Sequence, residues 1–289
     1  MSERNRPPIR DEIKRQVRQR CGFGCVICGL PLYEYEHMLG WANVQRHEAD
    51  EITLLCRFHH GEKTAGLLPL GEVIKANASP VNVRDRASRP YPLHYSGDSV
   101  ECKIGDSTFL TSKGQVSIAP IVVSGEPLIA FDLVDNQLLL TLNLYYKNND
   151  IILKVDKNEL IYSVNPWDIA FIGNVLTLRE SKRNILIEVE FLVPNKIHVR
   201  RGVFYKDGVE IIIGRDYFYV TNYDFMACGA PLVGVHVGVA IGNPKPAGIT
   251  CFYLGSEIRA LPDPVLSRRL LRKRVAEMRK IRNMLSGNS

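Results

Sequence analysis

The feature that most constrains this chain is a crowd of cysteine and histidine residues near its N-terminus. Four of the seven cysteines lie between residues 21 and 56, and four of the seven histidines lie between residues 37 and 60. Cys25-x-x-Cys28 and Cys56-x-x-His59 form two pairs, and two such pairs supply the sulfur and nitrogen ligands of a closed tetrahedral zinc site. We therefore predict a structural zinc ion on these four residues, which stabilises a unit too small to bury much apolar surface.

Two alternatives remain open for the ligands of this zinc site. Cys21 is a substitute that lies outside the paired pattern, and His60 is a substitute for its neighbour His59. Disulfide bonds are not expected, because the cysteine count is odd and the charged segment 1–20 lacks the apolar stretch of a secretory peptide. The most apolar window, 225–241, is broken by glycine and proline, so we expect a cytoplasmic protein with no membrane partner.

The rest of the chain predicts an α+β protein whose largest part is β. Apolar and polar residues alternate in 140–144 and 187–191, and Asp207-Gly208 favours a tight hairpin between the strands 203–205 and 209–213. Another strand is expected over 233–239. We predict an N-terminal unit over 1–70, a linker over 71–92, a β domain over 93–262 that is a sandwich or an irregular barrel, and a basic amphipathic helix over 263–289 that begins at Pro264.

Within the N-terminal unit we expect a helix over 7–20, strands over 33–38 and 52–55, and a helix over 57–68. In that order, the two Cys/His pairs, the run Glu34-Tyr35-Glu36-His37-Met38 and the run 52–64 resemble the HNH nuclease family, whose core is a ββα-metal motif. The resemblance covers residues 8–68, roughly a fifth of the chain, and it implies a zinc-stapled ββα-metal domain.

The resemblance also implies a role for individual residues. It makes His37 the general base that activates water, and it makes Glu36 and His60 ligands of a catalytic divalent cation, Mg²⁺ or Mn²⁺. This division of work is chemically sound, because attack on a phosphodiester needs a positioned base and a cation near the developing charge.

One position departs from the family pattern. The middle asparagine of the motif falls about where Asp50-Glu51 stands. We therefore assign Glu51 to the catalytic group, either orienting His37 by accepting its other N–H or binding the cation. Asn43 is a substitute from the preceding loop, and His47 is interpreted as an ordinary loop residue.

Basic residues at both ends suggest a nucleic-acid partner. Residues 1–20 carry a net charge of +4 and residues 263–289 a net charge of +6, while the remainder is slightly acidic. The candidate contacts to phosphate groups are Arg57, Lys63, Arg268, Arg269, Arg272 and Lys273. Alternatively, the apolar half of the last helix or the β domain serves a protein partner or a homo-oligomer.

These expectations together predict a metal-dependent HNH-type endonuclease that hydrolyses phosphodiester bonds, with DNA as the favoured substrate. The β domain would control it, as in modular nucleases of prokaryotic restriction and antiviral (anti-phage) defence systems. The alternative is a catalytically silent, zinc-stabilised nucleic-acid-binding protein, or an assembly subunit of a larger nuclease complex.

Overall fold

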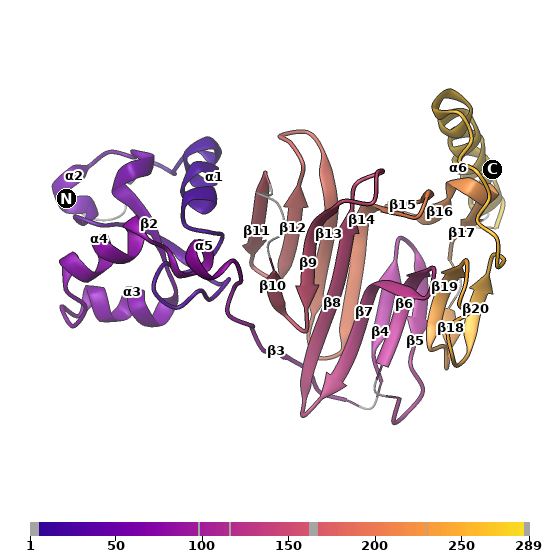
Figure 1. The fold of residues 1–289 in the computed structure, drawn as a ribbon, viewed down its shortest axis with the longest axis horizontal. Helices are drawn as coiled ribbons and strands as arrows, with labels where there is room; N and C mark the ends of the chain where they lie inside the picture. Colours follow the sequence, from indigo (N-terminus) through magenta and orange to yellow (C-terminus); the bar gives the residue numbers. More distant parts are fainter. Residues whose placement is uncertain (1–5, 98, 116, 162–166, 230, 286–289) are drawn as a thin grey trace.

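The computed structural model describes residues 6–97, 99–115, 117–161, 167–229 and 231–285. The fold is α+β and mostly β: a small N-terminal unit lies at one end of a β body, and one long helix lies at the other end (Figure 1). The elements of the N-terminal unit are α1 (Asp11–Arg20), β1 (Glu34–His37), α2 (Trp41–Val44), the 3-10 turn η2 (Ala49–Glu51), β2 (Ile52–Leu55), α3 (Arg57–Thr64), α4 (Leu70–Ala78) and α5 (Val81–Asp85).

The N-terminal unit has its own small core, built on the strand pair β1–β2. The two strands are antiparallel and place His37 opposite Ile52. Helix α1 covers them with Ile13 and Val17, which recur at helical spacing on its apolar stripe and are buried. The expected order of helix, strand, strand and helix is therefore present, although α1 starts at Asp11 rather than at residue 7, because Arg10 before it is extended.

The segment 71–92 was expected to be a linker, but it contains most of α4 and the whole of α5, and both helices pack on the N-terminal unit. Val73 of α4 is fully buried. Asn82 of α5 donates hydrogen bonds to the carbonyl oxygens of Gly22 and Gly29, at 2.9 and 3.2 Å. Polar and proline residues suggested a loop here, yet the Asn82 amide satisfies backbone carbonyl groups of the loop that carries the first cysteine pair.

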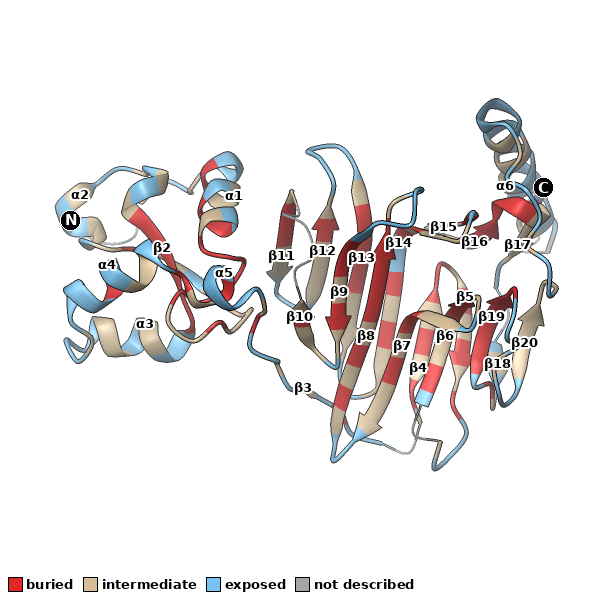
Figure 2. Ribbon diagram, viewed as in Figure 1, coloured by how far each residue is buried: buried red, intermediate tan, exposed pale blue. Residues whose placement is uncertain are grey.

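The β body contains two sheets that share one hydrophobic core (Figure 2). The first sheet has the strand order β10-β9-β8-β7-β6-β19-β20 with β3 beside β8, and the second has the order β11-β12-β13-β14-β15-β16-β17 joined by β4, β5 and β18. The strands are β3 (Leu93–His94), β4 (Glu101–Ile104), β5 (Ser107–Leu110), β6 (Ser117–Val123), β7 (Glu126–Val134), β8 (Gln137–Tyr145), β9 (Ile151–Asp156), β10 (Glu159–Ile161), β11 (Asp168–Ile172), β12 (Val175–Arg179), β13 (Ile185–Leu192), β14 (Lys196–Lys206), β15 (Val209–Gly214), β16 (Tyr217–Val220), β17 (Phe225–Ala227), β18 (Pro231–Val233), β19 (Val237–Ile241) and β20 (Thr250–Tyr253), with the 3-10 turn η3 (Thr221–Tyr223) after β16.

The hairpin expected at Asp207-Gly208 is confirmed between β14 and β15. Lys206 pairs with Val209, and Asp207 and Gly208 both have positive φ in the two-residue turn between them. The single strand expected over 233–239 is wrong, because the chain leaves β18 at Val233 and enters a different sheet at β19.

A buried ion pair joins the N-terminal unit to the β body. Arg18 of α1 donates to both carboxylate oxygens of Asp168 in β11, at 2.7 and 2.6 Å, and to the hydroxyl oxygen of Tyr35 in β1, at 2.5 Å. Both charged side chains are buried. Beside them, the Arg15 guanidinium lies 4.4 Å from the ring centre of Trp167. The candidate strand β1 is thus connected to the second sheet through one arginine.

The C-terminal helix α6 (Pro264–Leu285) begins at Pro264 as expected and packs on the β body through one face. Met278 is buried, Arg274 pairs with Asp224 at 2.7 Å, and Arg282 pairs with Asp106 at 2.6 Å. Arg274 lies among apolar positions of the helical pattern because it has this acidic partner. None of the described helices combines the length and the apolar character that a membrane span requires.

Candidate metal centre

The four predicted zinc ligands come together in the structure. One ligand atom from each of Cys25, Cys28, Cys56 and His59 lies within 4.8 Å of the others. The Nδ1 atom of His59 is 3.3 Å from the sulfur of Cys25 and 3.2 Å from that of Cys56. Three thiols and an imidazole are the donor set of a structural zinc site, so this cluster could hold a zinc ion.

The two alternatives for this cluster are resolved by position. Cys21 is buried outside it, with its sulfur 3.9 Å from the Thr53 hydroxyl, and burial raises the pKa of its thiol. His60 is not part of the cluster, and its two ring nitrogens lie near Glu34 and Glu36 instead. Within the cluster, a hydrogen bond between Cys25 and Cys28 lowers the pKa of Cys28 and raises that of Cys25. The site therefore favours a thiolate, the form that binds metal.

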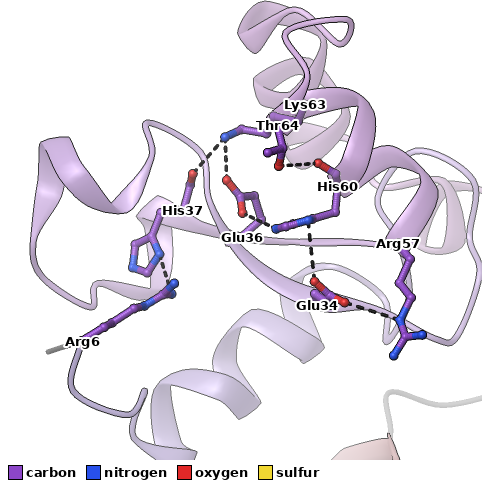
Figure 3. Close-up of polar contacts among 8 residues, drawn as sticks. All are labelled: Arg6, Glu34, Glu36, His37, Arg57, His60, Lys63 and Thr64. Atoms are coloured by element: carbon purple, nitrogen blue, oxygen red, sulfur yellow. Dashed lines mark hydrogen bonds and ion pairs between the residues drawn. The ribbon is translucent and has the colours of Figure 1, made fainter. Parts of the chain in front are cut away.

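A second polar group lies where β1 meets α3, and it contains Glu36 and His60 (Figure 3). The Glu36 Oε2 atom is 2.9 Å from His60 Nε2, and Lys63 Nζ is 2.6 Å from Glu36 Oε1. Glu34, two residues earlier on the same face of β1, lies 3.6 Å from His60 Nδ1. The packing of α3 beside β1 thus puts the two predicted cation ligands, Glu36 and His60, in contact, with the ammonium group of Lys63 beside them.

The His37 side chain points elsewhere. Adjacent residues of a strand face opposite sides, and Figure 3 shows the imidazole turned toward Arg6 rather than toward Glu36. The ring is only 1 % exposed. Its Nδ1 atom is 2.8 Å from an Arg6 nitrogen, and its Nε2 atom is 3.2 Å from the Arg46 carbonyl oxygen. His37 is therefore next to the Glu36–His60 pair in sequence but on the other side of the strand.

Three neighbours of His37 were not predicted as site residues. Arg6 lies over the ring of Trp41 at 5.1 Å, and His47 stacks on Trp41 with ring centres 4.8 Å apart. His47 Nδ1 is also 3.2 Å from His37 Nε2, so the interpretation of His47 as an ordinary loop residue misses a contact. Burial lowers the pKa of His37, and the charges of Arg6 and His47 lower it further.

Glu51 occupies a different position from the one expected. Its carboxylate forms an ion pair with the Arg46 guanidinium, and that hydrogen bond lowers the pKa of Glu51. The N–H of His37 points instead toward the Arg46 carbonyl oxygen. Glu51 thus pairs with the side chain of Arg46, the residue whose carbonyl oxygen contacts His37.

The expected phosphate contacts fall into two separate groups. Lys63 lies at the Glu36–His60 pair, while Arg57 is almost fully exposed and lies 3.5 Å from Glu34. The four expected residues of α6, Arg268, Arg269, Arg272 and Lys273, are exposed on a helix at the opposite end of the molecule (Figure 1). The structure does not bring these two groups together.

A comparison of the chain with protein-family models, with curated proteins and with solved structures finds no match.

Proposed function

We propose that the N-terminal unit is a metal-dependent nuclease that hydrolyses phosphodiester bonds, with DNA as the favoured substrate. The observation that carries the proposal is the contact of Glu36 Oε2 with His60 Nε2 at 2.9 Å. Glu36 comes from strand β1 and His60 from helix α3, and the same helix begins at the second pair of the Cys/His cluster, Cys56 and His59. The order of these elements supports the resemblance to HNH nucleases.

The donor set of Glu36 and His60 fits a divalent cation. Mg²⁺ and Mn²⁺ accept carboxylate oxygen and imidazole nitrogen, and adjacent ligands at about 2.1 Å from such an ion lie about 3 Å apart. When bound, the cation would supply stabilisation of the charge that develops on the attacked phosphate group. When Glu36 turns to a cation, the ammonium group of Lys63 becomes free to pair with phosphate.

The hydrogen bonds of His37 fit a general base. A guanidinium group can only donate, so the contact with Arg6 leaves the lone pair on Nδ1 and the proton on Nε2, where the Arg46 carbonyl oxygen accepts it. The lowered pKa keeps the ring neutral at pH 7. We infer that Arg6 moves to the phosphate when substrate binds, and that Nδ1 then accepts a proton from water across the end of β1.

A second candidate function is nucleic-acid binding without cleavage. Two observations favour it: the His37 ring is buried with both nitrogens in polar contacts, and Lys63 occupies the Glu36 carboxylate. In this alternative the Cys/His cluster stabilises a binding module, and the contacts around His37 are structural.

Plasmid cleavage separates the two functions. We expect the zinc-loaded wild type to nick or linearise supercoiled plasmid with Mg²⁺ or Mn²⁺, and we expect Glu36→Gln and His37→Ala to slow cleavage by about 100-fold or more. His94→Ala, at an exposed position of β3, is the matched control and should cut like the wild type. A wild type that shifts DNA in a gel but leaves it intact would support the binding module instead.

A further inference from the structure

Three faces can be distinguished on helix α6, and the packing seen among its described residues lies on one of them. That docked face carries Val275 and Met278 together with the two ion-paired arginines Arg274 and Arg282. A second face, which we call the basic face, carries exposed cations at successive turns: Arg268, Arg269, Arg272, Arg279 and Lys280. Because successive residues of an α-helix are about 100° apart, a third side of α6 remains that belongs to neither the docked face nor the basic face.

The third face is a narrow row of mostly apolar residues, which we call the outer stripe. It consists of Leu266, Leu270, Lys273, Glu277, Ile281 and Met284. Its apolar members include Leu266, which is 46 % exposed, Ile281, 54 %, and Met284, 63 %. Each of its first three positions is followed by another member of the stripe eleven residues later. Eleven residues make close to three turns of an α-helix, so all six positions lie on one side of it. The outer stripe is therefore a continuous contact surface along α6.

We propose that the outer stripe is a dimer interface, on which α6 of a second copy of this chain packs in the antiparallel direction. A two-fold axis at residue 275 places Leu266 opposite Met284 of the second copy, and the reverse. The same axis places Lys273 opposite Glu277 of the second copy. One surface thus meets itself, as a two-fold symmetric interface requires.

The charges at the centre of the stripe argue for this occupant and this direction. Lys273 and Glu277 lie 3.9 Å apart on one helix. In an antiparallel pair, Lys273 of each copy faces Glu277 of the other, so the facing charges attract. In a parallel pair, each would face the same charge. A helix lying on a membrane surface would instead present an uninterrupted apolar face, and Glu277 interrupts this one.

The geometry also has a consequence for the basic face. Rotation about an axis perpendicular to both helices keeps the two basic faces on the same side of the pair. Ten cations from two chains would then form one continuous surface, turned away from both docked faces. Their mutual repulsion is limited at physiological ionic strength, where the Debye length is about 8 Å.

Sedimentation of the full chain at about 150 mM salt tests the proposal. We expect the wild type to sediment as two chains. Lys273→Glu alone and Glu277→Lys alone should each weaken association by about tenfold or more, because they place like charges opposite each other, and the double variant should restore it. Ile281→Asp should give single chains.

Val265→Asp is the matched control, because Val265 is also exposed but lies beside the basic face and not on the outer stripe. It should remain dimeric, and all these variants should keep the wild-type circular dichroism spectrum, because the substituted side chains are exposed. A wild type that stays a single chain at its highest soluble concentration would overturn the proposal. A dimer that survives Ile281→Asp, or a double variant that fails to recover, would overturn the antiparallel stripe.

Discussion

At the scale of residues, the four side chains of the Cys/His cluster offer the most direct test of what stabilises the N-terminal unit. Loss of one thiolate should release the metal, and structural zinc contributes an apparent binding energy of about 10–16 kcal/mol to such small units. We expect Cys28→Ser to purify without zinc and with an unfolded N-terminal unit. Elemental analysis and the near-UV circular dichroism of the chain measure both effects.

Cys228→Ser is the control for this substitution, because Cys228 is exposed and free on the β body. It should retain one zinc ion per chain and the wild-type spectrum. Zinc retained in Cys28→Ser, or zinc absent from the wild type, would show that the cluster is not a zinc site.

At the scale of residues, spacing in the sequence predicted the metal ligands but not the surroundings of His37. The Cys25 and Cys56 pairs are local patterns, so their partners follow from short separations. Arg6, Trp41 and His47 come from segments without periodic pattern, and only tertiary packing puts them around one ring. A tryptophan and a histidine within ten residues of a candidate base were the available signal.

At the scale of elements, the contact of α1 with β11 should behave differently from an ordinary surface ion pair. Asp168→Ala leaves the buried Arg18 without its carboxylate, which should cost about 3–5 kcal/mol. Burial alone would lower the pKa of Arg18, but the hydrogen bonds that it donates to the Asp168 carboxylate hold this pKa above its usual value. We expect chemical denaturation to show the loss, together with easier proteolysis between the N-terminal unit and the β body.

The same helix provides the matched control. Arg20 pairs with Asp50 at 3.1 Å, but this aspartate is fully exposed, so Asp50→Ala should change stability by less than about 1 kcal/mol. Equal losses in the two variants would contradict a special role for the buried pair.

The attachment of α6 to the β body should depend on pH. Hydrogen bonds from Arg274 lower the pKa of Asp224. Because the pKa of Asp224 is lower in the folded state than in the unfolded state, its ionised carboxylate stabilises the fold. This contribution is complete above the pKa of an unfolded aspartate, about 3.9, and is lost as the pH falls through the pKa of the folded state. We expect hydrogen-exchange protection of α6 to fall as the pH drops from about 5 toward 3.

In Arg274→Gln this fall should be smaller but not absent, because Arg282 still pairs with Asp106. An unchanged fall in Arg274→Gln would mean that other carboxyl groups hold the helix.

Elements with a strong periodic pattern were predicted well, and those defined by distant contacts were not. The bounds of α6 and of β2 follow from the pattern of apolar residues. Helices α4 and α5 are short, contain asparagine and directly follow Pro69 and Pro80, so local propensity indicated a linker. Their helical form depends on tertiary packing: Val73 is fully buried, and Asn82 donates to carbonyl oxygens of residues 53 and 60 positions earlier.

At the scale of the whole molecule, the candidate metal centre and the basic helix lie at opposite ends of the long axis (Figure 1). The sequence did not indicate this arrangement, because it depends on the contact of Arg18 with Asp168, 150 residues apart. If α6 pairs as proposed, the two N-terminal units of a dimer lie at its outer ends. Each would then act on nucleic acid at a separate position, with the paired basic faces between them.

If Glu36 and His60 hold a cation distinct from zinc, anomalous X-ray scattering from crystals soaked in Mn²⁺ will locate it. We expect two peaks in each N-terminal unit: zinc among Cys25, Cys28, Cys56 and His59, and manganese at Glu36 and His60, with Lys63 displaced from the carboxylate. A single zinc peak, with Lys63 still paired to Glu36, would contradict this expectation.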